Sequence, residues 1–139
     1  MKTLLITSDF PPIVGGISTV FYNVWKHLPK NEFIILAPRV KESEAWDASF
    51  SGKVFRRRLP VKDTLFNKLI KTVFLLLYCA AILSEQKIEY FICGQPVIPG
   101  IVGLVMKKFR HIPFQVWVYG GEVVKFKRDK LIFSILLAV

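Results

Sequence analysis

The run Asp9-Phe10-Pro11-Pro12-Ile13-Val14-Gly15-Gly16-Ile17 decides the fold, because it joins a strand-like apolar segment at residues 3–7 to a helix that begins near Ile17. A strand that passes through glycines into a helix leaves unpaired backbone N–H groups at the positive end of the helix dipole. Such a place favours an anion, most often a phosphate. Gly15 and Gly16 are therefore a candidate phosphate site. A tight turn in which both glycines only supply positive φ explains the same residues equally well.

The composition is that of one globular domain over residues 1–139, with 53% hydrophobic and 22% charged residues. Cys79 and Cys93 lie in separate apolar runs rather than in a closely spaced pair, so we expect buried free thiols and no metal or redox motif. Met1 and Lys2 lead directly into a strand-like run, with no longer apolar segment and no small-residue cleavage site. We therefore expect a cytoplasmic protein.

The formal net charge of +10 indicates an acidic partner or a solvated basic face. No base-reading helix or aromatic stacking motif accompanies the basic residues, which disfavours nucleic acid as a partner. An anionic membrane surface explains them better, and a solvated basic face stays open as the alternative. The basic clusters lie at residues 56–58, at Lys62, Lys68 and Lys71, at residues 107–110 and at residues 125–130.

Strand-like and helical segments alternate along the chain. This alternation predicts a parallel sheet with right-handed crossovers and helices on both faces, which is the doubly wound, Rossmann-like α/β architecture. Residues 38–52 are polar and predict a loop with Trp46 tucked beneath it. The predicted strands cover residues 3–8, 32–37, 53–59, 90–93 and 114–118, and the predicted helices cover residues 17–28, 65–85 and 99–109.

The helix predicted at residues 65–85 has a nearly unbroken apolar centre at residues 73–83. That centre is much shorter than the roughly 20 apolar residues that a membrane-spanning helix needs. A helix buried against the sheet is the favoured interpretation, and a helix lying in a membrane interface is the next. In the second case Lys68 and Lys71 would flank the helix on a basic side.

Three loops are expected at the carboxyl ends of the strands, where ligands bind in doubly wound sheets. They are residues 9–16 after the first strand, residues 94–96 after the fourth and residues 119–122 after the fifth. Each carries glycine beside polar or aromatic groups. Their convergence predicts a binding cleft at this edge of the sheet.

The first of these loops, then Gly94-Gln95-Pro96, then Tyr119-Gly120-Gly121-Glu122-Val123, together resemble the N-terminal, acceptor-side domain of the family-four retaining glycosyltransferases. The likeness is nearest to the phosphatidylinositol mannosyltransferase-like branch and covers essentially the whole chain. It implies the GT-B class, in which two Rossmann-like domains enclose a cleft. It also implies metal-independent transfer of a hexose from a nucleotide-sugar, which is a co-substrate, with no cofactor.

The resemblance also implies roles for individual residues. Gly15 and Gly16 match the glycine loop whose backbone amides approach the donor diphosphate. Glu122 matches the acidic residue of a motif usually written His-Gly-x-Glu, and Tyr119 stands where that histidine is common. Tyr119 and Glu122 are accordingly the candidate catalytic residues. The residues assigned to the acceptor side of the cleft are Asp9, Gly94, Gln95 and Gly120.

Three of these residues have simpler explanations. In the family the histidine is thought to contact the transferred sugar. Tyr119 would therefore hydrogen-bond a sugar hydroxyl instead, or the site is impaired. The alternative is that Tyr119 is an aromatic cap on the sheet edge, without a role in the site. Glu122 would also be favourable as a carboxylate at a helix N-terminus, without any substrate. Asp9 is more often a turn former than a ligand.

In this family the C-terminal domain holds the nucleotide and supplies the basic residues on the diphosphate, and this chain lacks it. The sequence stops inside an apolar run that starts at Leu131, so we expect a truncated or split N-terminal half that is inactive alone and has a separate C-terminal half as a candidate partner. The expected function is sugar transfer to a lipid or polysaccharide intermediate of the cell envelope, at the inner face of the plasma membrane. The alternative is a non-catalytic Rossmann-like binding module that docks on a partner chain.

Overall fold

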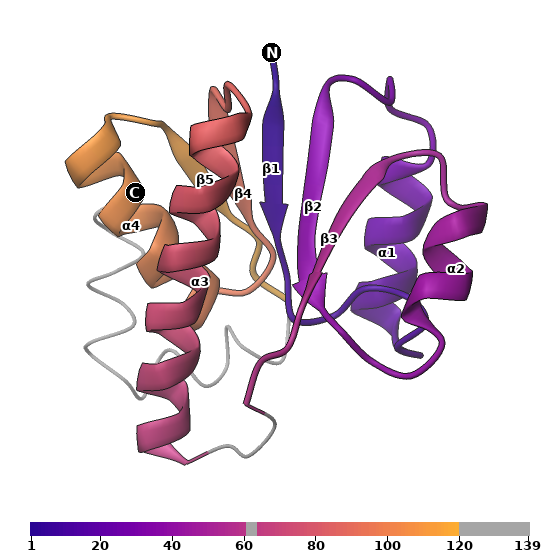
Figure 1. The fold of residues 1–139 in the computed structure, drawn as a ribbon, viewed down its shortest axis with the longest axis horizontal. Coiled ribbons are helices and arrows are strands. Elements are labelled where there is room, and N and C mark those ends of the chain that lie inside the picture. The colour runs from indigo at the N-terminus through magenta and orange to yellow at the C-terminus, as the bar shows by residue number, and fades with distance from the viewer. Residues whose placement is uncertain (61–63, 120–139) are drawn as a thin grey trace.

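Parallel strands form the central sheet, as the alternation of segments predicts (Figure 1). The computed structural model describes residues 1–60 and 64–119. Its strands are β1 (Thr3–Ile6), β2 (Phe33–Pro38), β3 (Lys53–Arg57), β4 (Tyr90–Cys93) and β5 (Phe114–Val116). Its helices are α1 (Gly16–Trp25), α2 (Ser43–Ser49), α3 (Leu65–Glu85) and α4 (Ile98–Arg110).

The strand order β3-β2-β1-β4-β5 places the first strand at the centre of the sheet. The chain moves outward from β1 through β2 to β3, returns to β4 on the other side of β1, and moves outward again to β5. Its direction therefore reverses between β1 and β4, which are paired from Thr3 opposite Tyr90 to Ile6 opposite Cys93. In doubly wound sheets the crevice beside such a reversal is where ligands bind.

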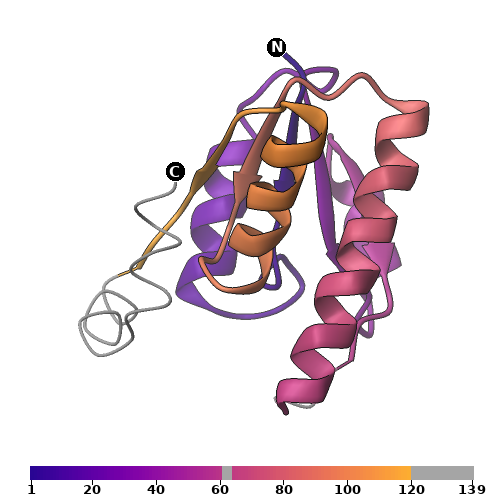
Figure 2. The ribbon, with the colours of Figure 1, turned by 90° about the vertical axis from the view of Figure 1, so that its left-hand side faces the viewer.

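Helices cover both faces of the sheet, so the predicted doubly wound architecture is confirmed (Figures 1 and 2). Because side chains of a strand alternate between faces, Leu4 and Ile6 belong to the core under α3 and α4, whereas Leu5 belongs to the core under α1 and α2. The core under α1 and α2 is rich in aromatic rings, among them Phe21 and Trp25 of α1.

The prediction of a loop over residues 38–52 is wrong, because α2 forms within it. Trp46 anchors this helix, because its ring lies 5.5 Å from that of Phe10 and 5.3 Å from that of Phe50. The sequence predicts that Trp46 tucks under this segment, and its side chain is partly buried against the aromatic core. A large aromatic side chain thus helps to hold a short helix that apolar periodicity does not reveal.

The prediction for α3 was right in its bounds and wrong in its burial. The helix runs from Leu65 to Glu85, and the Thr64 hydroxyl caps it by accepting a hydrogen bond of 3.2 Å from the Asn67 backbone N–H. The helix is long and apolar enough to cross a membrane by length and composition alone, contrary to the expectation from its apolar centre. Only 17% of its most apolar 18-residue window is buried.

Candidate functional site

The side chain of Gln95 joins the loops that follow β1 and β4. Its Oε1 accepts a hydrogen bond of 3.0 Å from the Ser8 backbone N–H, and its Nε2 donates to Asp9 Oδ2 at 2.8 Å and to Thr7 Oγ1 at 3.2 Å. Ser8 and Gln95 are 87 positions apart in sequence, and the pairing of β1 with β4 brings them together. The structure therefore places Asp9 and Gln95, two of the predicted site residues, side by side where the chain reverses direction.

Gly94 lets the two loops approach this closely. A Cβ atom at Gly94 would lie 2.8 Å from Cζ of Phe21 and 2.9 Å from Cβ of Thr7, closer than real Cβ atoms come to their neighbours. The backbone N–H of Gly94 also donates a hydrogen bond of 2.8 Å to the Ile6 carbonyl. Gly94 thus belongs to the predicted cluster, where it fits because it has no side chain.

The first turn of α1 opens into solvent at Gly15 and Gly16. Gly15 is the N-cap, with an extended φ of 172°, and no side chain caps the helix and no acidic residue lies in its first turn. No glycine among the described residues lies in the left-handed φ region that favours glycine, so the interpretation of a turn that needs such a φ at Gly15 and Gly16 is wrong. A Cβ at either glycine would meet no atom within 4 Å. The amides at the positive end of α1 are therefore accessible to an anion.

One further polar group of this turn has no partner. The Ser18 hydroxyl is buried, with 1% of the residue exposed, and has no hydrogen-bond partner within the described part of the chain. A buried hydroxyl without a partner is costly. The first turn of α1 therefore combines accessible amides with an unsatisfied hydroxyl.

Arg56 ties the glycine loop, residues 9–16, to β3 and α2, and the sequence did not predict this role. Its side chain, 6% exposed, forms an ion pair with Asp47 of α2, with 2.7 Å between Arg56 Nη2 and Asp47 Oδ1. The guanidinium also donates to the carbonyls of Pro38, at 3.2 Å, and of Pro11, and it lies over the Phe10 ring at 5.5 Å. Arg56 is thus a buried tie between β3, α2 and the glycine loop, not a member of a solvated basic cluster. Its partner Asp47 lies in the helix that the sequence did not predict.

The structure places the ring of Tyr119 in the aromatic core beneath α1. Its centroid lies 6.3 Å from that of Phe21, with the planes at 88°, and the neighbouring Trp117 packs 5.4 Å from the same ring. This is the geometry of the aromatic cap that is the alternative to a sugar contact. Gly120 and Glu122, the other residues predicted in this loop, lie outside the described residues.

Cys93 ends β4 beside Gly94, and its buried thiol favours the protonated form. Burial raises the pKa of Cys93 to about 12, and a backbone hydrogen bond from Gly103 lowers it only in part. Both cysteines are free and buried, as the sequence predicts. Within residues 1–60 and 64–119, no group of three or more His, Cys, Asp or Glu side chains is placed to hold a metal ion.

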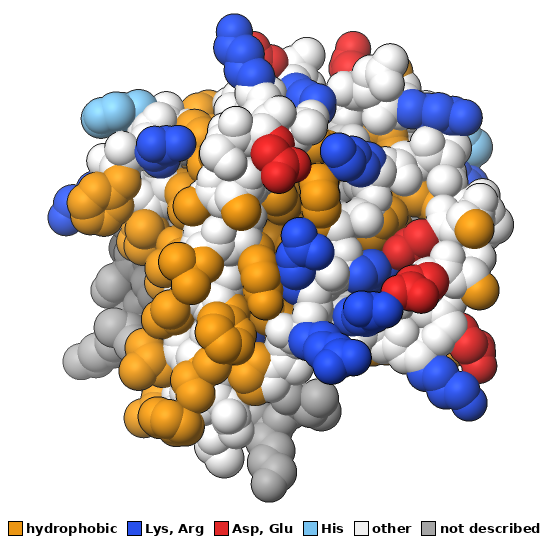
Figure 3. Space-filling model, in the orientation of Figure 1, with side chains coloured by type: hydrophobic (Ala, Val, Ile, Leu, Met, Phe, Trp, Pro, Cys, Tyr) orange, Lys and Arg blue, Asp and Glu red, His pale blue; other side chains and the backbone are white. Residues whose placement is uncertain are grey.

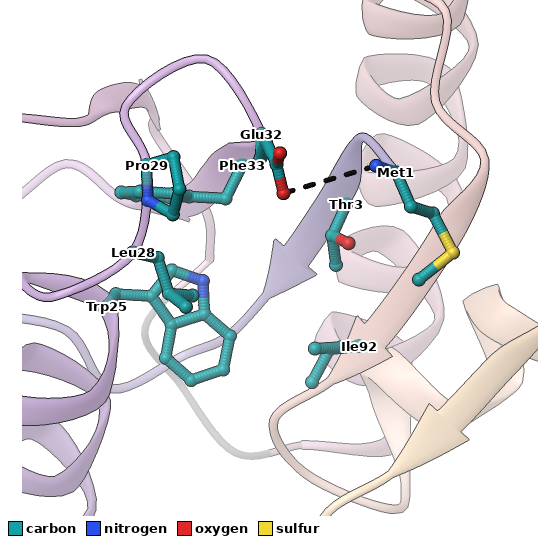
Figure 4. Close-up of a pocket in the computed structure, with 8 residues that line it drawn as sticks. All are labelled: Met1, Thr3, Trp25, Leu28, Pro29, Glu32, Phe33 and Ile92. Carbon is teal, nitrogen blue, oxygen red and sulfur yellow. Dashed lines mark ion pairs between the residues drawn. The ribbon is translucent and has the colours of Figure 1, made fainter.

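A small pocket lies at the opposite end of the sheet, beside the amino ends of the strands. Its volume is about 190 Å³, and its walls include Thr3 and Phe33, the first residues of β1 and β2, with Trp25 across from them (Figure 4). The N-terminal ammonium lies 4.0 Å from the Glu32 carboxylate at its rim. Because this pocket lies at the amino ends of the strands, it is separate from the Asp9–Gln95 site.

The chemistry of the site follows from these groups. The Asp9 carboxylate and the Gln95 amide meet beside β1 and β4. The accessible amides of α1 lie at the same end of the sheet, because α1 connects the parallel strands β1 and β2 and begins past the carboxyl end of β1. Such a set suits a polar, anionic ligand with hydroxyl groups. No family model matches this sequence, and no curated protein matches it.

Proposed function

We propose that this chain is the N-terminal, acceptor-side part of a metal-independent glycosyltransferase that uses a nucleotide-sugar donor. The observation that carries the proposal is the geometry at the reversal point, where Gln95 binds Asp9 at the end of the sheet from which α1 begins with an uncapped first turn. The resemblance of the same loops to family-four glycosyltransferases supports it. The donor diphosphate would bind at Gly15 and Gly16, because helix N-terminal amides stabilise the charge that develops on a leaving diphosphate.

The remaining residues take their roles from this arrangement. Asp9 and Gln95 would bind hydroxyl groups of the acceptor or of the transferred sugar. Glu122 would act near the reacting carbon. Tyr119 stands in place of the family's histidine, and a role for it in catalysis would require its ring to leave the packing against Phe21. By the same resemblance a C-terminal half would supply the nucleotide pocket, so the proposal includes that half as a partner and expects residues 1–139 to need it for turnover.

The acceptor class follows from charge and composition. A net charge of +10 supports work at the anionic inner face of a membrane, from the cytoplasmic side, on a lipid or polysaccharide intermediate of the cell envelope. The same charge offers no specific support for nucleic acid, because the chain lacks a base-reading or stacking motif.

A titration with nucleoside diphosphates tests the donor site. We expect UDP or GDP to shift the backbone amide signals of Gly15, Gly16 and Ile17 in a ¹⁵N NMR spectrum. The double variant Gly15→Ala/Gly16→Ala should weaken this binding without loss of stability, because the added methyl groups meet no protein atom yet stand where the diphosphate approaches. An unchanged spectrum at millimolar nucleotide would contradict the proposed donor site.

Gly100→Ala is the matched control for that titration. Gly100 lies in α4, and its added Cβ would come no closer than 3.7 Å to a side chain packed against the helix, so the fold accepts it as readily. This variant should bind the nucleotide as the parent chain does. Inorganic phosphate, titrated in parallel, distinguishes a general anion site from one that also recognises the nucleoside.

A non-catalytic Rossmann-like interaction module is the second candidate function. The exposed apolar residues of α3 favour it, because a large exposed apolar surface marks a place of interaction. The two candidates differ in their activity once the C-terminal half is present. Reading the intact mass of the native gene product together with its downstream DNA identifies that half, and sugar transfer by the combined halves would eliminate the module.

A further inference from the structure

The outer side of α3 carries an apolar stripe that the fold does not use. The stripe consists of six residues with 40% to 86% of their surface exposed, namely Leu65, Phe66, Leu69, Val73, Phe74 and Leu77. The opposite side of the helix is anchored in the sheet by Leu75, Cys79 and Ile82. Figure 3 shows the stripe as a band of hydrophobic side chains along α3.

The stripe continues into a groove between α3 and α4. The groove has a volume of about 360 Å³, and apart from Arg110 its lining is apolar. Leu77 belongs to both the stripe and the groove, and Phe109 of α4, 72% exposed, closes the far side. The stripe and the groove together form one apolar surface that is too continuous to be a scatter of single exposed residues.

Among the described residues, the charged side chains of α3 along this surface are cationic up to the last residue of the helix. The helix carries Lys68 and Lys71 and no acidic residue before Glu85 at its end. Arg57 of β3 lies over the ring of Tyr78 of α3, 5.3 Å from its centroid, and Figure 3 shows Lys and Arg side chains beside the hydrophobic band. An apolar helix face bordered by cations is complementary to an anionic lipid surface.

We propose that α3 docks the protein on an anionic membrane by lying flat in the interface, with the stripe among the lipid tails and the cations at the headgroups. A second copy of the chain is a poorer occupant, because a two-fold contact through this surface would bring its cations together. A membrane-spanning α3 is excluded by its anchoring side, since Leu75, Cys79 and Ile82 would leave the core of the sheet.

This orientation connects the surface to the candidate site. The N-terminal half of α3, which holds the most exposed stripe residues, projects past the carboxyl ends of the strands (Figures 1 and 2). The Asp9–Gln95 pair also lies at the carboxyl ends of the strands. Docking would therefore hold the site beside the lipid surface, as a lipid acceptor requires. The inference rests on the membrane part of the proposed function and is independent of its sugar chemistry.

Sedimentation with lipid vesicles tests the docking. The parent chain should bind vesicles that contain phosphatidylglycerol and bind pure phosphatidylcholine vesicles weakly. The double variant Leu69→Ser/Val73→Ser should lower the partition coefficient about tenfold or more, because two apolar side chains no longer enter the lipid. Raising the salt concentration should weaken binding of the parent chain severalfold.

Val20→Ser/Leu28→Ser is the matched control, because it also removes one exposed valine and one exposed leucine. These residues lie in and after α1, on the other side of the sheet, and are 43% and 42% exposed. The control should bind vesicles as the parent chain does. Equal losses in both double variants, or no loss in either, would overturn the docking surface.

A fluorescent label at position 69 distinguishes a membrane from the other possible occupants of the stripe. The native thiols are buried, so the variant Leu69→Cys can be labelled at the new thiol with an environment-sensitive fluorophore. Its emission should shift to the blue, and brominated lipid should quench it, only when anionic vesicles are added. A blue-shifted emission before vesicles are added would mean that a second copy or residues 120–139 cover the stripe, and would refute the proposal. Nucleotide binding at Gly15 and Gly16 is unaffected by either result.

Discussion

The helices α1 and α3 use their apolar residues in opposite ways. α1 has 10 residues, and its Phe21 and Trp25 are at most 1% exposed under a layer of other aromatic rings. α3 has 21 residues, yet its stripe leaves large apolar side chains such as Phe66 in solvent, 70% exposed. Apolar content therefore does not measure how much of a helix the fold covers. The short helix serves the core, and the long one has a surplus that serves an interaction.

Removal of a ring from the α1 side should have the largest effect. Phe21→Ala empties a place between Trp25, Trp117 and Tyr119, whose centroids lie 5.4, 5.4 and 6.3 Å from that of Phe21. We expect a loss of about 4 kcal/mol in the free energy of unfolding, from lost burial and the remaining cavity. Urea denaturation followed by tryptophan fluorescence measures it. A loss below roughly 1 kcal/mol would mean that the aromatic core is loosely packed.

Loss of the tie beneath the glycine loop should rank second. Arg56→Ala leaves the Asp47 carboxylate without its partner and frees the carbonyls of Pro11 and Pro38. We expect a loss of about 3 kcal/mol, because breaking a buried ion pair leaves an uncompensated charge. The double variant Arg56→Met/Asp47→Leu should recover much of that loss. Equal stability of the single and double variants would show that the ion pair is not what holds the loop.

The contrast between the two helices also shows where sequence reasoning succeeds. The parallel sheet, the bounds of α3 and the junction of the β1 and β4 loops follow from apolar runs separated by glycine and proline. These are local signals in the sequence, and the strands and helices that they predict can be connected into a parallel sheet in only a few ways. The pairing of Gln95 with Asp9 depends in addition on the strand order, which places β1 beside β4 and which the apolar runs do not specify.

What the sequence conceals depends on contacts between distant residues. α2 is held by the ring of Trp46, and Arg56 is buried only because α2 brings Asp47 to it. The charge of Arg56 alone predicts a solvated surface, since most arginines are exposed. The exposure of the α3 stripe is also not predictable from the sequence. An apolar helix pattern does not show how much of the helix surface the sheet is wide enough to cover.

A change of pH tests the packing beneath α3, where both cysteines lie. Burial raises the pKa of Cys79 above its usual range and that of Cys93 to about 12 from 9.0. The folded state therefore keeps these protons while the unfolded chain releases them. Stability is complete below pH 9 and falls as the pH rises toward 12, by on the order of 1 kcal/mol from Cys93 at pH 10. Urea denaturation at pH 8 and pH 10 measures the fall, and a Cys93→Ala variant should show a smaller one.

Removal of a phenylalanine ring from α3 should have the smallest effect on the free energy of unfolding. Phe66→Ala repeats the chemistry of Phe21→Ala at a side chain that is 70% exposed, so little buried surface is lost and no cavity forms. We expect the free energy of unfolding to change by no more than about 0.5 kcal/mol, and the replacement by alanine, a better helix former, offsets part of any loss. Urea denaturation beside Phe21→Ala provides the comparison. A loss near that of Phe21→Ala would show that Phe66 is covered in solution, so that α3 and α1 both serve a core. A negligible loss together with weaker vesicle binding would separate the two helices by role, because the residue would matter for docking and not for folding.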